Sequence, residues 1–123
     1  MGVLFDVLCR AADASTEKNW DEFAACYHED VDAWAPTYTV HGRGELLRTI
    51  RQQNDPVDGI RLDMKLVVEA ESTVVAEWVW SIPHPSGEGR ASNHGLSYYV
   101  FDDGVIRTVR QYFDTASFLA ELA

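Results

Sequence analysis

The N-terminal third of the chain spaces its apolar residues as amphipathic helices do. A first helix is predicted to run to about Ala14, because apolar positions recur every three or four residues. These positions are Val3, Leu4, Val7, Leu8 and Ala11. A polar break from Ser15 to Asn19 follows, after which Asn19 or Asp21 can cap a second helix. The apolar side of that helix consists of Trp20, Phe23, Ala24 and Tyr27.

A short strand from Val31 to Ala35 is predicted next, and it ends before Pro36. The turn residues from His41 to Gly44 then introduce a third helix. In this helix, ELLRTIRQQ carries its apolar residues on one face and its arginines on the other.

The second half of the chain has the β-branched and aromatic segments that are typical of strands. Four strands are predicted, over residues 60–70, 74–82, 91–101 and 105–113, and they are separated by Glu71-Ser72, PHPSGEG and Asp102-Asp103-Gly104. A last helix, from about Ala116 to Leu122, is capped by Asp114 or Thr115. Helices grouped first and antiparallel strands afterwards indicate an α+β fold, in which one sheet curls over its helices. We expect a single domain over residues 1–123.

Composition and charge exclude several classes of function. The formal net charge is −10 and the chain holds only ten Lys and Arg, so a nucleic-acid partner is not expected. Cys9 and Cys26 lack the CxxC or CxxH spacing of a zinc site, which favours two buried thiols and no metal. Because no long apolar run and no basic leader are present, we expect a cytoplasmic protein that does not bind membranes.

Three stretches carry a resemblance to a known superfamily: WDEFAACYHEDVDAWAP, HGRGELLRTI and FDDGVIRTVRQYFDTASF. With the order of elements, they make nearly the whole chain resemble the nuclear transport factor 2 superfamily. Within it, the chain is similar to the SnoaL-like group of polyketide cyclases, ketosteroid isomerases, limonene epoxide hydrolases and scytalone dehydratases. The resemblance implies a cystatin-like α+β barrel, which is a cone-shaped, curved antiparallel sheet wrapped around N-terminal helices. It also implies a ligand cavity on the concave face and no cofactor.

The catalytic positions that the resemblance implies are largely replaced in this chain. Trp78 and Trp80 stand where the epoxide hydrolases have an Arg and an Asp, and Gln111 stands where they have a second Asp. Hydrolysis by that carboxylate mechanism is therefore not expected. The general-base Asp of the isomerases falls on Ala35, whereas Pro83-His84 resembles the catalytic His after a strand-ending Pro in the dehydratases.

Trp78 and Trp80 allow two interpretations. In the predicted strand VVAEWVWSIPHP their indoles point to the same side, where they either fill the core or form the wall of a pocket for a flat apolar ligand. The cone-shaped fold favours the pocket. The residues expected to bind the ligand are Trp34, Trp78, Trp80, Asn93, Gln111 and Phe113.

His84 and Asp32 are the expected catalytic residues. His84 lies between two prolines at a strand exit, where an imidazole can shuttle a proton at the mouth of a cavity. If Asp32 points inward beside Trp34, burial would raise its pKa and make it a general acid or base; otherwise it is a solvated carboxylate. His94 faces the convex side unless a bulge at Gly95 changes the parity, so which of the three reaches the cavity stays open.

Two functions are compatible with these patterns. The favoured one is a cofactor-independent acid–base enzyme, of the cyclase, isomerase or dehydratase type, acting on an apolar polycyclic or polyketide-like small molecule in an aromatic-lined cavity. The alternative is a non-catalytic protein of the same fold that binds a small apolar ligand or dimerises. We expect a homodimer through the outer face of the sheet, because Val79, Tyr98 and Val100 would otherwise expose apolar surface.

Overall fold

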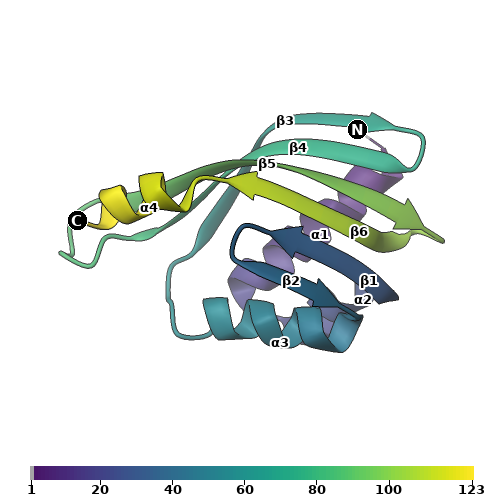
Figure 1. The fold of residues 1–123 in the computed structure, drawn as a ribbon, viewed down its shortest axis with the longest axis horizontal. Coiled ribbons are helices and arrows are strands. Elements are labelled where there is room, and N and C mark those ends of the chain that lie inside the picture. Colours follow the sequence, from purple (N-terminus) through teal and green to yellow (C-terminus); the bar gives the residue numbers. More distant parts are fainter. Residues whose placement is uncertain (1) are drawn as a thin grey trace.

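The computed structural model describes residues 2–123 and confirms the α+β class (Figure 1). Its helices are α1 (Val3–Glu17), α2 (Trp20–Ala25), α3 (Arg43–Asn54) and α4 (Thr115–Leu122). Its strands are β1 (Tyr27–Ala35), β2 (Tyr38–His41), β3 (Arg61–Ala70), β4 (Thr73–Pro83), β5 (Arg90–Asp102) and β6 (Val105–Phe113). The first three helices gather on one face of the sheet, while α4 lies apart from them beside the β4–β5 turn (Figure 1). Within this described range, no helix combines the length and apolarity that crossing a membrane requires.

The strands form one curved sheet in the order β2-β1-β6-β5-β4-β3, with β2 and β3 as unpaired edges. All neighbours are antiparallel except β1 and β6, which run parallel with Asp32 in register with Thr108. The expectation of an antiparallel sheet is corrected at this one junction. β1 and β6 are not joined by a hairpin, because α3 and four strands intervene, so nothing in the connection imposes antiparallel pairing.

Element boundaries differ from the sequence-based expectation in the N-terminal half. α1 continues to Glu17 and ends where Lys18 adopts a left-handed conformation, with φ of 61°. Tyr27, expected on the second helix, instead starts β1, because α2 ends at Ala25. The four-residue strand β2 was not predicted from the pattern. It pairs only with β1, and four residues are too few for an alternation to stand out.

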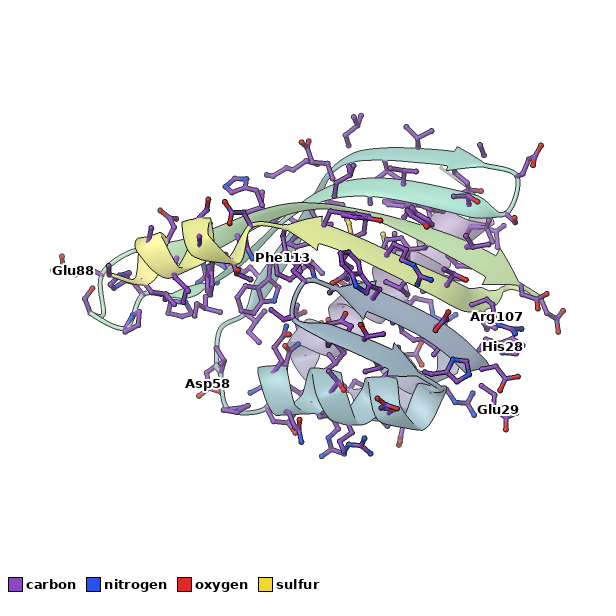
Figure 2. The ribbon with its side chains drawn as sticks, in the orientation of Figure 1. His28, Glu29, Asp58, Glu88, Arg107 and Phe113 are labelled. Atoms are coloured by element: carbon purple, nitrogen blue, oxygen red, sulfur yellow. The ribbon has the colours of Figure 1, made fainter. Side chains whose placement is uncertain are left out.

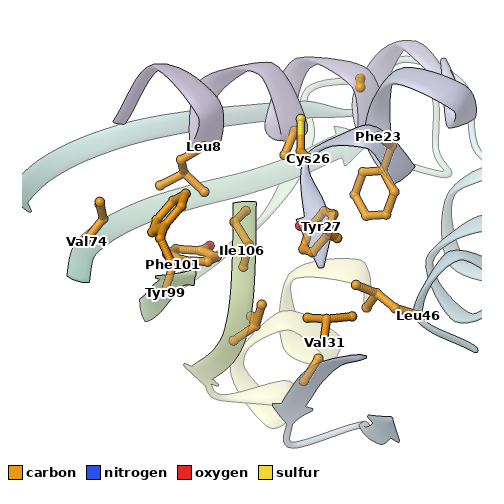
Figure 3. Close-up of a cluster of buried hydrophobic side chains, with 14 of the residues drawn as sticks. Leu8, Phe23, Cys26, Tyr27, Val31, Leu46, Val74, Tyr99, Phe101 and Ile106 are labelled. Carbon is orange, nitrogen blue, oxygen red and sulfur yellow. The ribbon is translucent and has the colours of Figure 1, made fainter. Parts of the chain in front are cut away.

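The hydrophobic core fills the part of the concave face that α1 and α2 cover (Figure 3). Val31, Val74 and Ile106 are fully buried in it, and they belong to three different strands. Tyr27 and Tyr99 belong to the same buried cluster and also line the cavity next to it. Core and cavity are therefore adjacent parts of one concave face.

Candidate functional site

A cavity of about 300 Å³ lies between the concave face of the sheet, α1, α3 and the start of α4. Strand alternation explains which side chains reach it, because every second residue of a strand points to the same face. On β4 these residues are Trp78 and Trp80, on β5 they are Asn93 and Tyr99, and on β6 they are Val109, Gln111 and Phe113. The helices contribute mostly small or aliphatic groups, including Leu8, Ala11, Ala12, Leu46 and Ile50.

Two edge-on aromatic pairs form one wall of the cavity. The ring centroids of Trp78 and Phe113 lie 5.9 Å apart, and those of Trp80 and Phe118 lie 5.5 Å apart, both in T-shaped geometry. Figure 2 shows Phe113 at the end of β6, close to the start of α4. Such a wall offers ring faces and edges against which a flat apolar molecule can stack.

Gly95 gives Trp78 its place in this wall. The two residues are cross-strand partners, and a Cβ added at Gly95 would overlap the Trp78 ring. The indole therefore lies across the β5 backbone, where its Nε1 donates a 2.7 Å hydrogen bond to the Ser97 Oγ. Because position 95 has no side chain, the indole can lie flat on β5, and the space in front of the ring stays open.

A hydrogen-bonded group of polar side chains lines the cavity next to the aromatic wall. The Tyr38 hydroxyl donates to the Gln111 Oε1 at 3.3 Å, and the Tyr99 phenol hydrogen-bonds Ser97 and Gln111. Burial raises the pKa of Tyr38, and it also raises the pKa of Tyr99 and of the neighbouring Tyr27. All three phenols are therefore neutral at physiological pH and can donate hydrogen bonds, but they cannot act as bases there.

Asn93 is the polar residue of the sheet wall on the other side of the Trp78–Phe113 pair. It is cross-strand partner to Trp80, lines the cavity and is 9% exposed. Within residues 2–123 no protein group hydrogen-bonds its amide, although every fully enclosed side-chain polar atom in that range has a partner. The Asn93 amide thus opens on the empty space of the cavity.

No charged side chain from residues 2–123 lines the cavity: its polar groups are hydroxyls and amides. In the same part of the chain, no group of three or more His, Cys, Asp and Glu is placed to hold a metal ion. The cavity can therefore donate and accept hydrogen bonds, but it offers no counter-ion for a charged ligand.

Five of the residues expected to bind the ligand come together around the cavity: Trp78, Trp80, Asn93, Gln111 and Phe113. Trp34, the sixth, does not line it. Trp34 points to the outer face of the sheet, where its ring packs on Tyr112 at a centroid distance of 5.2 Å. The inward positions of β1 belong to Val31, Ala33 and Ala35, which are buried.

Asp32 shares the outward side of β1 with Trp34, so the expectation that it points into the cavity is wrong. Its side chain is half exposed and its Oδ1 lies 3.3 Å from the His41 Nδ1, while the Arg110 guanidinium lies 3.6 Å from its Oδ2. The hydrogen bond from His41 and the positive charge of Arg110 lower the pKa of Asp32, whereas inward burial would have raised it. The carboxylate stays ionised on the outside of the sheet.

Neither histidine candidate lines the cavity. His84 lies in the β4–β5 loop, where its Nδ1 accepts a hydrogen bond from the Ser86 backbone N–H at 3.0 Å and so stabilises the turn. His94 is exposed on the outer face, because the β4–β5 register continues without a bulge through Gly95. Catalytic roles for His84 and Asp32 stay untested predictions, but their positions offer no direct access to a ligand in the cavity.

Sequence reasoning missed the phenols of Tyr27, Tyr38 and Tyr99, and it missed Phe118 on α4. Tyr99 could have been found, because it is two residues beyond Ser97 on the same side of β5. Tyr38 could not, because its strand was not predicted. Tyr27 was expected on the apolar side of the second helix, but it is the first residue of β1.

Comparison with known proteins gives one family match and many similar structures. The sequence matches the SnoaL-like domain family over residues 9–109. An LEH-like epoxide hydrolase from M. tuberculosis has a TM-score of 0.81 at 16% identity, with 98% of this chain and 89% of that chain covered. A proposed polyketide cyclase from Xanthomonas campestris pv. campestris has a TM-score of 0.78 at 21% identity, with 98% and 97% covered.

The protein TerC, co-crystallised with polyporic acid, has a TM-score of 0.83 at 16% identity, with 98% of each chain covered. At these identities the structural likeness establishes the fold alone. No curated protein matches the sequence.

Proposed function

The chain belongs to the SnoaL-like domain family, and from that membership and the shape of its cavity we propose that it binds a flat, uncharged, largely apolar small molecule bearing a carbonyl or hydroxyl oxygen. The observation that carries the proposal is the lining of the 300 Å³ cavity: an aromatic wall, a set of neutral hydrogen-bonding groups and no charged side chain. Ligand pockets in proteins commonly have this composition.

The size and polarity of the cavity narrow the ligand class. At about 300 Å³ the cavity is at the lower end of the usual range for ligand sites, which suits a molecule of two or three rings. An anionic ligand is disfavoured, because a buried carboxylate without a counter-ion loses far more hydration energy than hydroxyl or amide contacts return.

A second candidate is cofactor-independent catalysis in the same cavity, and the Tyr38–Gln111–Tyr99 hydrogen-bond group favours it. Neutral phenols held in a buried site can stabilise negative charge that develops on a substrate oxygen. A suitable reaction is a cyclisation in which an enol carbon attacks a carbonyl carbon of the same molecule. A C–C bond forms, the enol oxygen becomes a carbonyl and the attacked carbonyl oxygen becomes a hydroxyl. The phenol gives its proton to that oxygen and takes up the enol proton in the same step, so it stays neutral. No separate base is needed.

Ligand binding is tested with three probes of one shape: naphthalene, 2-naphthol and naphthalene-2-carboxylate. We expect isothermal titration calorimetry to give the tightest binding for 2-naphthol, and the carboxylate to bind at least about tenfold more weakly because its charge is unpaired. Trp80→Ala should abolish binding of 2-naphthol, whereas His94→Ala on the outer face serves as the matched control. Failure of 2-naphthol and naphthalene to bind, or a preference for the carboxylate, would contradict the proposal.

Catalysis is tested by turnover of linear aromatic polyketide mimics that can cyclise through an enol. Tyr38→Phe should lower kcat by about tenfold or more and leave ligand affinity within a few fold, because one hydrogen bond to the developing oxyanion is lost. His84→Ala and Asp32→Asn should keep full activity. A loss of turnover in either of these two variants, with Tyr38→Phe unaffected, would return catalysis to the residues first expected.

A further inference from the structure

The Asn93 side chain lines the cavity opposite Trp80, and no side-chain hydrogen bond within residues 2–123 involves its amide. Its residue is 9% exposed, and no fully enclosed side-chain polar atom in this range lacks a partner, so the amide is reached from the cavity. Water in the cavity can satisfy such an amide, and a ligand that displaces this water has to supply the hydrogen bonds in its place. The side chain opens on the cavity, so a bound molecule can supply these hydrogen bonds.

Asn93 and the Tyr38–Gln111 pair lie on opposite sides of the Trp78–Phe113 aromatic pair. Along β5, Asn93 stands opposite Trp80, Gly95 opposite Trp78, and Ser97 opposite Gln111 of β6. Asn93 and Ser97, which marks the position of Gln111, are four residues apart along β5. This separation is about 13 Å at the usual rise per residue. With a hydrogen bond of about 2.9 Å at each end, roughly 7 Å remains between two ligand oxygens.

We propose that the ligand of this cavity carries two uncharged oxygens at opposite ends of a flat aromatic body, and that Asn93 binds one of them. The other oxygen is bound by Tyr38 and Gln111, and the body lies against Trp78 and Phe113. This inference rests on the proposed function, since it names the ligand class of the same cavity. An amide donates and accepts, so Asn93 accommodates a carbonyl or a hydroxyl.

The probe for this inference is 2,6-dihydroxynaphthalene, which bears hydroxyls at both ends of the fused rings, and its partner is 2-naphthol, which bears one. We expect the wild-type protein to bind the diol about threefold to tenfold more tightly than 2-naphthol, beyond the factor of two that the symmetry of the diol provides. Asn93→Leu should remove this preference and leave the affinity for 2-naphthol nearly unchanged, because 2-naphthol keeps its hydrogen bonds to Tyr38 and Gln111.

Two further variants complete the experiment. Tyr38→Phe together with Asn93→Leu should weaken both compounds, and His94→Leu, the neighbouring residue on the outer face, should affect neither. The melting temperature of the ligand-free Asn93→Leu protein should equal or exceed that of wild type, because no protein group within residues 2–123 hydrogen-bonds the amide and an apolar group of similar size replaces it. If Asn93 served only to stabilise the fold, this substitution would lower the melting temperature.

The outcomes separate this inference from the proposed function. If wild type binds neither compound, the proposed function fails. If wild type binds both compounds equally, or if Asn93→Leu keeps the preference for the diol, the proposed function stands and the assignment of Asn93 is wrong. A clear drop in the melting temperature of the ligand-free variant would also overturn the assignment.

Discussion

Gly95 controls the shape of the cavity because the Trp78 indole occupies the space where a side chain would begin. Gly95→Ala should push the ring off β5 into the cavity and break its hydrogen bond to Ser97. We expect a loss of about 1–3 kcal/mol in the free energy of unfolding, which is typical of overpacking, together with weaker ligand binding.

Urea denaturation and calorimetry on the same variant measure both effects. The matched control is Gly44→Ala on α3, where an added Cβ meets nothing within 4 Å. It should be neutral or stabilise the protein by up to about 1 kcal/mol, since alanine favours helices over glycine. If the two variants had equal free energies of unfolding, the Trp78 ring would move aside without loss of stability, which would contradict this prediction.

Asp32 predicts a small pH dependence of stability. Its pKa in the folded protein lies below the ordinary value of 3.8, so the stabilisation by His41 and Arg110 is present above that value and is lost as the pH falls through the folded pKa. Because the side chain is half exposed, we expect Asp32→Asn to cost less than about 1 kcal/mol. The difference in unfolding free energy from wild type should be largest above about pH 5 and should shrink below pH 4. A difference that grows on acidification would contradict this reading.

The alternation of side chains along a predicted strand showed which residues share a face, but it did not always show which face points toward the cavity. Trp78, Trp80, Asn93 and Gln111 were placed together correctly as lining residues, because the order of inward positions follows from strand alternation. On β1 the same rule grouped Asp32 with Trp34, and the pair proved to face outward. Small and β-branched residues, rather than the tryptophan, fill the inner side of that strand, because α3 lies close to it.

Among the elements, α4 is the least tightly held. None of its residues is buried, its Asp114 cap accepts a hydrogen bond from the Ala116 backbone at 3.0 Å, and its ring contact with the body is Phe118 on Trp80. We expect its amides to exchange with deuterium faster than those of the other helices, since few buried contacts oppose local opening. Binding of 2-naphthol should slow that exchange, because Phe118 lines the cavity.

Phe118→Ala should speed exchange in α4 and weaken ligand binding, while the global free energy of unfolding changes little. Leu119→Ala is the control on the same helix, since Leu119 is 64% exposed and should alter none of the three measurements. Slow exchange in ligand-free α4 would show that the helix is a firm part of the fold.

Elements with long, clear patterns were predicted well, and those that depend on distant partners were not. β6 was predicted with the bounds that it has, because Val105–Phe113 begins after the turn residue Gly104. β2 exists only because β1 offers an edge to pair with, and this information is not local. The Asp114 cap was among the expected alternatives, since capping is local chemistry.

At the scale of the whole molecule, we propose that two copies associate through the outer face of the sheet. Leu96 is 48% exposed there and is the cross-strand partner of Tyr112, which packs on Trp34. Together with Tyr98 these side chains form a contiguous apolar surface of the kind that marks interfaces. Leu96→Arg should give a monomer in light scattering at micromolar concentration.

The control for this dimer is Leu119→Arg, which adds the same charge on α4 and should leave the mass unchanged. Each copy carries a net charge of −10, so the two repel one another and added salt should strengthen association by screening. A wild-type monomer at all salt concentrations would exclude the dimer.

The fold of the whole chain was recognised from three local stretches, and the family match confirms that recognition. The parallel junction and the open edges were not expected, because single-sequence patterns carry no information on which distant strands become neighbours. The cavity lining was predicted in part for the same reason: Trp78, Trp80 and Phe113 lie on β4 and β6 of one meander, whereas the phenols come from β1, β2 and β5.

The pairing of β1 with β6 also sets an order of events during synthesis. Asp32 finds its partner Thr108 only when nearly the whole chain has left the ribosome, and Tyr38 and Gln111 are 73 residues apart. Until then β1 presents an unpaired edge, which invites association with other nascent chains. A ligand can therefore assist folding only after β6 has been synthesised. A chain truncated before β6 lacks the cavity as well as the strand.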